Sequence, residues 1–441
     1  MTTHKKVRPM SSTNLATRNP GVIAVSPSAR RLMTSMRDIG YNPSTAIADL
    51  VDNSISAGAK RVDVDISFQG SHSRIAVADD GSGMSALQLD EALRFGSRRG
   101  YEASDLGRFG LGLKTAGLSL GRRVSVLTRN TPARPIVRTR VLDLDHVSEV
   151  DRWEVLTETS PSNQALARSS LSKTSGTVVV VEQLDRILPE EPDSGWAKRR
   201  FTTVESAVKQ YLAMVFHRFI EGKVGPRVEL SVNGKKLQPW NPFAPKESST
   251  QELERQTFEI ETDIGMQTVT YHPWVLPPRN QFSSQEEFER LSGPKRWNRQ
   301  QGLYVYRADR LVQGGGWAGL RGIDEHTKLA RAAVHFDSRL DDAFKIDVAK
   351  MRVRLPLELK KSMERAVNEL CHRADNAYRS ASREVTRPDT VDVSPSKGDR
   401  EIALAISLAA YDIDEFESLT KIMQQLRKVN PELAEQLGWS G

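Results

Sequence analysis

The chain has 441 residues, of which 38% are hydrophobic and 27% charged, so it is long enough for two or three domains with sizeable cores. No apolar run approaches the ~18 residues of a membrane span, and the basic N-terminus lacks the apolar core of a secretory signal, which favours a cytoplasmic protein. A net charge of +7 permits binding to nucleic acid without requiring it, and a single cysteine, Cys371, excludes an intrachain disulfide.

The first third of the chain is predicted to contain helices followed by strands. Residues 1 to about 25 are expected to be a flexible basic tail. The stretch 26–43 is expected to hold a helix that ends near Gly40, and 44–57 a second helix. Period-two alternation predicts a hairpin of strands at 61–67 and 74–79. Further strands are expected at 123–129, 135–144 and 176–184, with a helix at 114–121. This order predicts a two-layer α/β (α+β) sandwich rather than a doubly wound sheet.

After Arg186 the pattern changes, and residues 186–385 are expected to form a second α/β domain. Its predicted elements are a helix at 196–222, hairpins at 228–237 and 302–313, and a long helix at 355–384. The Pro-rich, polar passage at about 239–300 is interpreted as an insertion or a set of exposed loops. Residues 386–399 are expected to be a linker, and 400–441 a helical C-terminal segment.

Two polar residues on the helix at 44–57 form the first candidate site. Asp49 and Asn53 are four residues apart, which places a carboxylate and an amide side by side on one helical face. The amide oxygen of Asn53 is a ligand type that Mg²⁺ accepts, and the Asp49 carboxylate could align and deprotonate an attacking water. The alternative for this helix, taken alone, is a solvated polar face.

The second candidate is the acidic turn after the strand at 74–79. Asp79 ends this strand, where a carboxylate can accept a hydrogen bond from an exocyclic amine such as that of adenine. Gly81 and Gly83 let the backbone turn tightly beside a flat base, and an ordinary Asp-Gly turn is the alternative. A dinucleotide fingerprint also matches formally from Gly81. Two carboxylates at its mouth would repel a pyrophosphate and no βαβ unit surrounds it, so that interpretation is rejected.

A glycine-rich stretch that leads into a helix is the third candidate. It reads Gly107-Arg108-Phe109-Gly110-Leu111-Gly112-Leu113-Lys114. Backbone amides at a helix start form an anion site, and Lys114 adds positive charge to it. The spacing is not that of a Walker loop, because Gly112 and Lys114 are not adjacent. A flexible loop before a helix is the alternative.

In this order the three stretches resemble the GHKL superfamily: DNA gyrase B subunits, MutL mismatch-repair proteins, ninety-kilodalton heat-shock chaperones, histidine kinases and MORC ATPases. The resemblance implies a Bergerat-type ATP-binding domain over 26–185. By position, Asn53 matches the family's Mg²⁺-binding asparagine and Asp79 its adenine-binding aspartate. The other implied ATP-binding residues are Gly81 and Gly83 of the first glycine box, Gly107, Arg108, Phe109, Gly110, Leu111 and Gly112 of the lid, Lys114 at the phosphates, Ala57 and Met84 at the base, and Thr177, which supports adenine through the aspartate.

One position departs from the family pattern. Asp49 stands where ATP-hydrolysing members carry glutamate, and because an aspartate is one methylene shorter, water activation is expected to be weaker, slow or absent. Within the superfamily, residues 95–121 look most like MORC and related prokaryotic ATPases. In relatives with a second, transducer-like domain a loop lysine senses the γ-phosphate. Lys350 is the first candidate for this role and Lys345 the second, with an ordinary exposed loop lysine as the alternative.

The resemblance implies an Mg²⁺-dependent ATP-binding protein and slow ATPase in which ATP closes the lid and gates formation of a homodimer. The likeness to MORC proteins and the basic charge favour DNA as the partner, with genome or anti-phage defence as the setting, and the C-terminal helices as a place for protein partners. Two alternatives stay open: a non-hydrolysing ATP sensor, and a chaperone-like ATPase that acts on protein clients.

Overall fold

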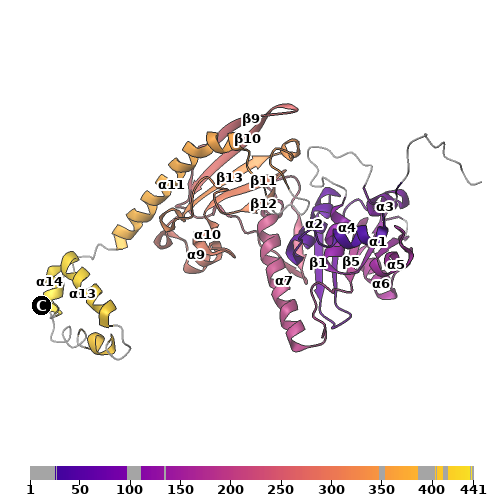
Figure 1. The fold of residues 1–441 in the computed structure, drawn as a ribbon, viewed down its shortest axis with the longest axis horizontal. Helices are drawn as coiled ribbons and strands as arrows, with labels where there is room; N and C mark the ends of the chain where they lie inside the picture. The colour runs from indigo at the N-terminus through magenta and orange to yellow at the C-terminus, as the bar shows by residue number, and fades with distance from the viewer. Residues whose placement is uncertain are drawn as a thin grey trace, which may run out of the picture. The chain divides into compact units, whose positions relative to one another are not determined.

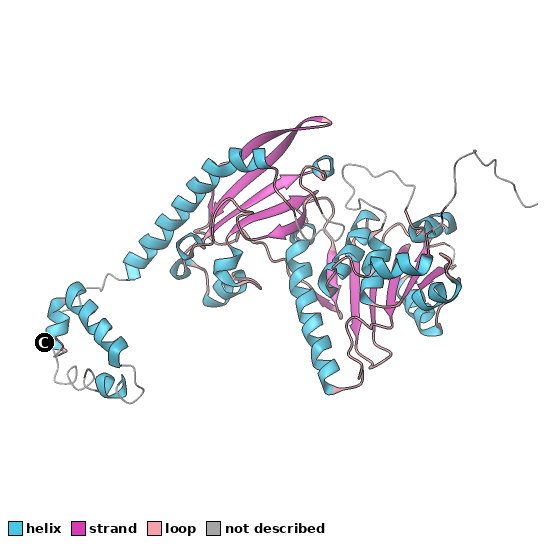
Figure 2. Cartoon of the chain, in the orientation of Figure 1, coloured by secondary structure: helices cyan, strands magenta, loops and turns pink. Residues whose placement is uncertain are grey.

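The computed structural model describes residues 25, 27–96, 111–133, 136–346, 353–385, 403, 405–410, 416–437 and 439. The chain divides into a large unit that ends at Ser380 and a C-terminal unit that begins at Ala381. Figure 1 shows two β-sheets with their helices in the large unit, and Figure 2 shows helices among the described residues of the C-terminal one. No described helix is long and apolar enough to cross a membrane.

The first sheet has seven strands in the order β4-β3-β5-β2-β1-β6-β7. Its strands are β1 (Arg61–Ser67), β2 (Arg74–Asp79), β3 (Arg123–Arg129), β4 (Arg138–Asp143), β5 (Gly176–Glu182), β6 (Glu229–Val232) and β7 (Lys235–Lys236). Neighbours run antiparallel except β1 and β6, which are parallel. The predicted hairpin is present, with Val62 of β1 opposite Asp79 of β2. This register places Asp79 at the very end of its strand.

Most helices of this part cover one face of the first sheet (Figure 1). They are α1 (Ala29–Met36), α2 (Pro43–Ser56), α3 (Ala86–Leu93), α4 (Gly112–Leu120), α5 (Leu144–Val150), α7 (Gly195–Val215) and α8 (His217–Glu221), while α6 (Pro161–Ser170) packs on the other face. Val179 and Val181 of β5 point into the larger core, and Val178 and Val180 pack with Ala167 of α6. A strand buried on both faces needs an unbroken apolar run, which β5 has. The predicted two-layer α/β class is confirmed.

The first core continues beyond residue 185, where the sequence pattern suggested a domain boundary. Phe201, Val208 and Leu212 of α7 are buried in that core, and β6 extends the sheet by pairing with β1. The predicted helix at 196–222 is two helices, because the chain leaves helical geometry at Phe216. The segment after residue 185 therefore completes the first sheet and its covering helices, together called the first layer, before the chain enters the second sheet. The second sheet and its helices are called the second layer.

The second sheet has the order β12-β11-β13-β10-β8, with β9 paired to β10. Its strands are β8 (Gln251–Glu252), β9 (Gln256–Thr262), β10 (Gly265–Val275), β11 (Gly302–Arg307), β12 (Arg310–Gly314) and β13 (Ala330–Phe336). Short helices flank them: η1 (Arg279–Gln281), α9 (Gln285–Leu291), α10 (Arg296–Gln300), η2 (Glu325–Thr327) and η3 (Ser338–Leu340). The predicted hairpin at 302–313 is β11 and β12, which turn at Ala308 and Asp309 with φ of 45° and 63°.

The interpretation of 239–300 as exposed loops is wrong. This segment holds β10, an 11-residue strand that pairs with β13 on one side and with β8 and β9 on the other. Two features hid it: Pro273 lies inside β10, and β9 is polar because only Ile260 of its seven residues is buried. An edge strand with one buried side chain has no clear apolar alternation, so its composition resembles that of a loop.

The long helix α11 (Leu357–Val385) covers the second sheet. Leu359, Met363, Leu370 and Ala374 recur at helical spacing and are buried in the second core. Cys371 lies on the same stripe, buried, and burial raises the pKa of its thiol to about 11. In the C-terminal unit the structure describes α13 (Phe416–Val429) and α14 (Pro431–Gln436), in agreement with the helices expected there.

Candidate nucleotide-binding site

Asp79, the last residue of β2, is held by three hydrogen bonds. Its Oδ1 accepts from the backbone amides of Gly81, at 2.9 Å, and Thr177, at 3.2 Å, while Oδ2 accepts from Ser54 Oγ at 3.0 Å. The three donors come from the following turn, from β5 and from α2, so the carboxylate is fixed at the junction of three elements. Burial raises the pKa of Asp79, and the three hydrogen bonds oppose this shift. The side chain is only partly buried, which leaves part of it accessible to a ligand.

Three glycines around Asp79 sit where no side chain fits. A Cβ on Gly81 would lie 2.9 Å from both Cβ and O of Ala57, and one on Gly83, with φ +62°, would lie 2.1 Å from the Arg129 carbonyl oxygen. A Cβ on Gly176 would lie 2.0 Å from the carbonyl oxygen of Asp79 itself. Close approach of neighbouring atoms requires glycine at all three positions, and at Gly83 and Gly176 the positive φ requires it as well. The alternative of an ordinary Asp-Gly turn does not account for this crowding.

A pair of threonines ties the glycine turn to the sheet. Thr128 Oγ1 accepts from the backbone amide of Met84 at 2.9 Å, and it lies 3.1 Å from Thr177 Oγ1 and 3.0 Å from the Gly176 carbonyl oxygen. On the other side of the turn, the amide of Ser82 donates to the Ala57 carbonyl at 3.0 Å. The structure therefore brings Ala57, Asp79, Gly81, Gly83, Met84 and Thr177 together.

The polar face of α2 is solvated only in part, because its carboxylates are buried. Asn53 is exposed, but Asp49 and Asp52 each retain only 1% of their accessible surface. Asp49 Oδ2 accepts from the Tyr41 hydroxyl at 2.5 Å, and a Cβ on Gly112 would lie 3.6 Å from the same oxygen. The expected base is thus buried beside the first residue of α4. Burial and the Asp49 charge raise the pKa of Tyr41 far above its usual range, which keeps the phenol protonated as the donor.

A cation from the second sheet balances these buried carboxylates. The Nε of Arg310, on β12, lies 3.0 Å from Oδ1 and 2.9 Å from Oδ2 of Asp52, and its Nη2 lies 3.7 Å from Asp49 Oδ1. Burial disfavours the charged guanidinium, but Asp52 and, less strongly, Tyr211 and Asp49 outweigh burial and raise the pKa of Arg310. Two buried carboxylates on one helix remain ionised only with such a partner.

The start of α4 supplies the expected anion site in part. Leu111 is the N-cap, and among the described residues no side chain caps the amides of α4. Lys114 points away from these amides, because its Nζ donates to the Ala92 carbonyl at 3.0 Å. Burial lowers the pKa of Lys114 to about 8, with Glu91 acting in the opposite direction. Its expected contact with phosphate therefore requires the side chain to move.

Several predicted residues cannot be placed. Gly107, Arg108, Phe109 and Gly110 of the lid lie outside the described residues, as does Lys350. Lys345, the second choice for the sensing lysine, is exposed and has φ +47°. It lines a cavity of about 450 Å³ together with Arg354 and Lys360 in the second sheet's layer. The roles of these residues stay predictions.

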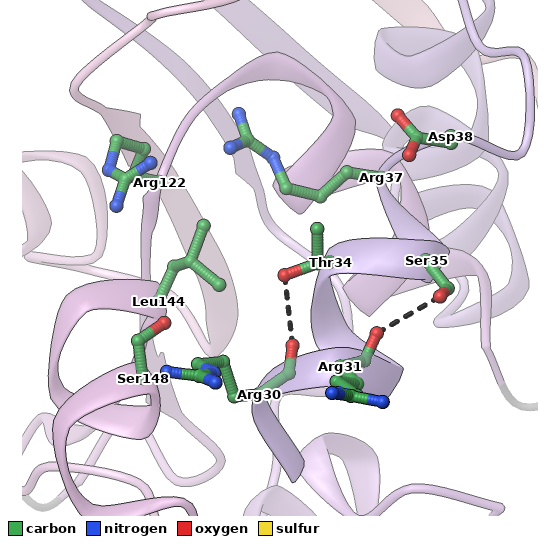
Figure 3. A pocket seen from close by; sticks show the side chains of 9 residues that line it. All are labelled: Arg30, Arg31, Thr34, Ser35, Arg37, Asp38, Arg122, Leu144 and Ser148. Carbon is green, nitrogen blue, oxygen red and sulfur yellow. Dashed lines mark hydrogen bonds between the residues drawn. The ribbon is translucent and has the colours of Figure 1, made fainter. Parts of the chain in front are cut away.

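Another cavity, of about 480 Å³, lies beside α1 and not at the predicted ATP residues (Figure 3). Its wall includes Arg30, Arg31, Arg37 and Arg122. The charge of this wall is partly balanced, because Arg37 pairs with Asp185 and Arg122 pairs with Asp145 and Asp185. The arrangement is basic, but it contains none of the residues that hold Asp79.

Sequence reasoning missed five residues of the site: Tyr41, Ser54, Thr128, Gly176 and Arg310. Two of them carried a local signal, because Ser54 follows Asn53 and Gly176 precedes Thr177. Arg310 carried none, since it lies 258 positions from Asp52.

Comparison with known proteins agrees with this geometry. Residues 41–177 match the family described as histidine kinase-, DNA gyrase B- and HSP90-like ATPase. Over 202 residues, 45% of this chain, the sequence is 31% identical to the DNA mismatch repair protein MutL of Pseudomonas fluorescens (strain SBW25) and covers 28% of it. Over 209 residues, 47% of this chain, it is 26% identical to MutL of Klebsiella pneumoniae and covers 30% of it. The chain thus spans less than a third of these curated relatives.

A solved crystal structure, of the N-terminal domain of a DNA repair protein, aligns with a TM-score of 0.45 and 16% identity. The alignment covers 82% of this chain and all of the other. The matched family segment begins at Tyr41 and ends at Thr177, so it contains Asp49, Asn53 and Asp79. Residues 41–177 are therefore similar to the ATP-binding domains of the GHKL superfamily.

Proposed function

We propose that this chain is an Mg²⁺-dependent ATP-binding protein and a slow ATPase, in which bound ATP closes the lid and gates formation of a homodimer. The observation that carries the proposal is Asp79, fixed by Ser54, Gly81 and Thr177 beside a turn too crowded for side chains. A carboxylate held this rigidly at a surface is suited to recognise one donor geometry, such as that of the adenine amine.

The residues around Asp79 fit an adenine nucleotide. Ala57 and Met84 flank the glycine turn, where a flat base could lie against them. The uncapped amides of α4 and the glycine-rich residues before it would hold phosphates. Asn53 has an exposed side chain, and its amide oxygen is suited to Mg²⁺, which commonly takes one or two protein ligands and completes its shell with phosphates and water. The ion would neutralise phosphate charge.

Asp49 is the general base in this proposal. Its carboxylate lies beside Gly112 at the start of α4, the end of the helix that favours anions, so a phosphate bound there would be close to it. Since the Tyr41 hydroxyl already donates to one oxygen of the carboxylate, its basicity is reduced, and this supports slow turnover.

DNA is the favoured partner. The relatives named above are DNA mismatch repair proteins, and the chain carries a net charge of +7. Charge of this sign favours association with a polyanion. In this proposal the second sheet and the C-terminal helices transmit the state of the nucleotide to the partner.

The first experiment measures ATP binding and then phosphate release, with and without duplex DNA, for wild type, Asp49→Asn and Asn53→Ala. Wild type should bind Mg²⁺·ATP and release phosphate slowly, and DNA should raise the rate. Asp49→Asn should bind but not hydrolyse, and Asn53→Ala should lose the Mg²⁺-dependent part of binding. Failure of folded wild type to bind ATP contradicts the whole proposal, whereas stimulation by unfolded protein clients instead of DNA would identify a chaperone-like ATPase.

A second candidate is a non-hydrolysing ATP sensor. The burial of Asp49 against Tyr41 and Arg310 favours it, because a carboxylate engaged on both oxygens is a poor base. Tight Mg²⁺·ATP binding and dimerisation without any phosphate release would select this alternative.

A further inference from the structure

One side chain of the second sheet reaches into the ATP-binding layer. Arg310 begins β12, yet its side chain is 1% exposed and lies against α2 of the first layer. The Nε atom is within 3.0 Å of both carboxylate oxygens of Asp52, and Nη2 is 3.7 Å from Oδ1 of Asp49. The guanidinium thus bridges two acids spaced one turn apart on the helix that also carries Asn53.

The two oxygens of Asp49 face different partners. Oδ2 accepts the Tyr41 hydroxyl at 2.5 Å, and Oδ1 is directed toward the Arg310 cation. Other titratable groups around this cluster are Asp52, on α2 itself, and Tyr211, on α7, whose electrostatic contact is with Arg310. A neighbouring cation favours the ionised form of a carboxylate, whereas burial and the second carboxylate favour the protonated form. Arg310 is therefore the group that offsets both.

We propose that Arg310 is a positioning residue for ATP turnover, which holds Asp49 ionised and oriented from the second sheet through the Asp52–Arg310–Asp49 cluster. This proposal rests on the assignment of Asp49 as the base. Because β12 supplies the cation, displacement of β12 from α2 would remove the positive charge beside Asp49 Oδ1, which favours the ionised form of this carboxylate and fixes its orientation. Turnover thereby depends on the docking of the second sheet's hairpin.

The chain offers a matched control for this idea. Arg307, on β11 of the same hairpin, forms a buried pair with Asp341 at 2.7 and 2.8 Å. Both partners belong to the second layer and neither is one of the predicted nucleotide residues. Arg307→Gln removes a buried guanidinium of equal size, so it measures the general cost of losing such a pair.

The test compares Arg310→Gln, Arg310→Lys and Arg307→Gln in the full chain. For Arg310→Gln we expect kcat for phosphate release to fall at least ~10-fold, ATP affinity to stay within about 3-fold, and the acid limb of the kcat–pH profile to move up by about one pH unit. Arg310→Lys keeps the positive charge but loses the planar guanidinium and its several N–H donors. Its turnover should therefore fall, while the acid limb of the kcat–pH profile stays near that of wild type. Arg307→Gln should change neither quantity.

A nucleotide-free measurement separates this proposal from the proposed function. The free energy of unfolding is measured against pH with and without Asp49→Asn, in the wild type and in the Arg310→Gln and Arg310→Lys variants. The difference reports the pKa of Asp49, which should rise when the cation is removed. If wild type releases no phosphate but this shift is present, the proposed ATPase activity is wrong, while the effect of Arg310 on the ionisation of Asp49 stands. If Arg310→Gln does not fold, Arg310→Lys decides: unchanged turnover overturns the role. Equal effects of Arg307→Gln and Arg310→Gln on the pH profile would also overturn it.

Discussion

The guanidinium of Arg310 and the carboxylate of Asp52 meet at 2.9 Å, although 258 positions separate them in the chain, and both side chains are 1% exposed. This pair joins β12 of the second sheet to α2 of the first layer. It explains how α2 can bury a carboxylate on a face that also presents Asn53. A buried ion pair adds little net stability over an apolar pair, but removal of one partner is costly.

The Arg310–Asp52 pair predicts a non-additive result. Asp52→Leu leaves the Arg310 cation buried without its nearest carboxylate, and should lower the free energy of unfolding by about 3 kcal/mol. The double variant Asp52→Leu with Arg310→Met removes both charges, so its cost should be well below the sum of the two single costs. Urea unfolding of the four proteins gives the coupling, and simple additivity would show that the pair is not an energetic unit.

Local features of the first layer could be predicted because their causes are local. Alternation over 61–67 and 74–79 gave the strands at their observed bounds, and the apolar run after Gly176 gave β5. Asp79 and its glycines were identified for the same reason, since a strand end, an acid and a tight turn lie within a few residues. The resemblance to a family then linked Thr177, almost a hundred positions away, to that turn.

What could not be predicted depends on contacts between distant segments. The burial of Asp49 and Asp52 depends on Arg310, and the polar face of a helix carries no sign of a cation supplied from another sheet. The strand β10 was missed because Pro273 interrupts its pattern and its partner β9 is largely exposed. In both cases tertiary packing overrides the local signal.

Crowding at Gly83 should make it far less replaceable than a glycine with a similar dihedral angle in open space. Gly83 has φ +62° and would place a Cβ 2.1 Å from the Arg129 carbonyl oxygen, whereas Gly234, in the β6–β7 turn, has φ +72° and nothing within 4 Å. Gly234→Ala should cost about 1 kcal/mol of strain, and Gly83→Ala more than about 3 kcal/mol. Chemical denaturation of both variants measures the difference. Equal costs would mean that the turn at Gly83 relaxes freely.

Asp79 should select adenine, and its neighbour Asp80 provides the control. Asp79→Asn replaces one acceptor by a donor at the expected position of the adenine amine, so ATP affinity should fall about 10- to 100-fold. Asp80 Oδ1 accepts from the backbone amides of Lys60 and Arg61, each at 2.8 Å, and holds the start of β1. Asp80→Asn should therefore affect stability more than affinity. Calorimetric titration with ATP measures the affinity of both variants. An unchanged ATP affinity in Asp79→Asn would show that Asp79 does not contact the nucleotide.

Lys114 offers a pH-dependent test of the phosphate site. Burial lowers its pKa from 10.5 to about 8 in the absence of ligand, so near pH 8 about half of these side chains are neutral. Between about pH 8 and 10.5 the folded protein binds fewer protons than the unfolded chain. Stability should therefore rise with pH across that window, relative to Lys114→Met.

Binding of ATP should reverse this shift if Lys114 leaves the Ala92 carbonyl for the phosphates. Nearby phosphate charge raises the pKa of an ammonium group, so at pH 8 each ATP bound should bring up to about half a proton onto Lys114. Titration calorimetry in two buffers of different ionisation enthalpy measures this uptake, and Lys114→Met supplies the background from other groups. Proton uptake that is the same in both proteins would mean that Lys114 stays on Ala92. In that case its side chain would serve the packing of α4 against α3 through the Ala92 carbonyl, and the phosphates would depend on the amides of α4 and the residues before it.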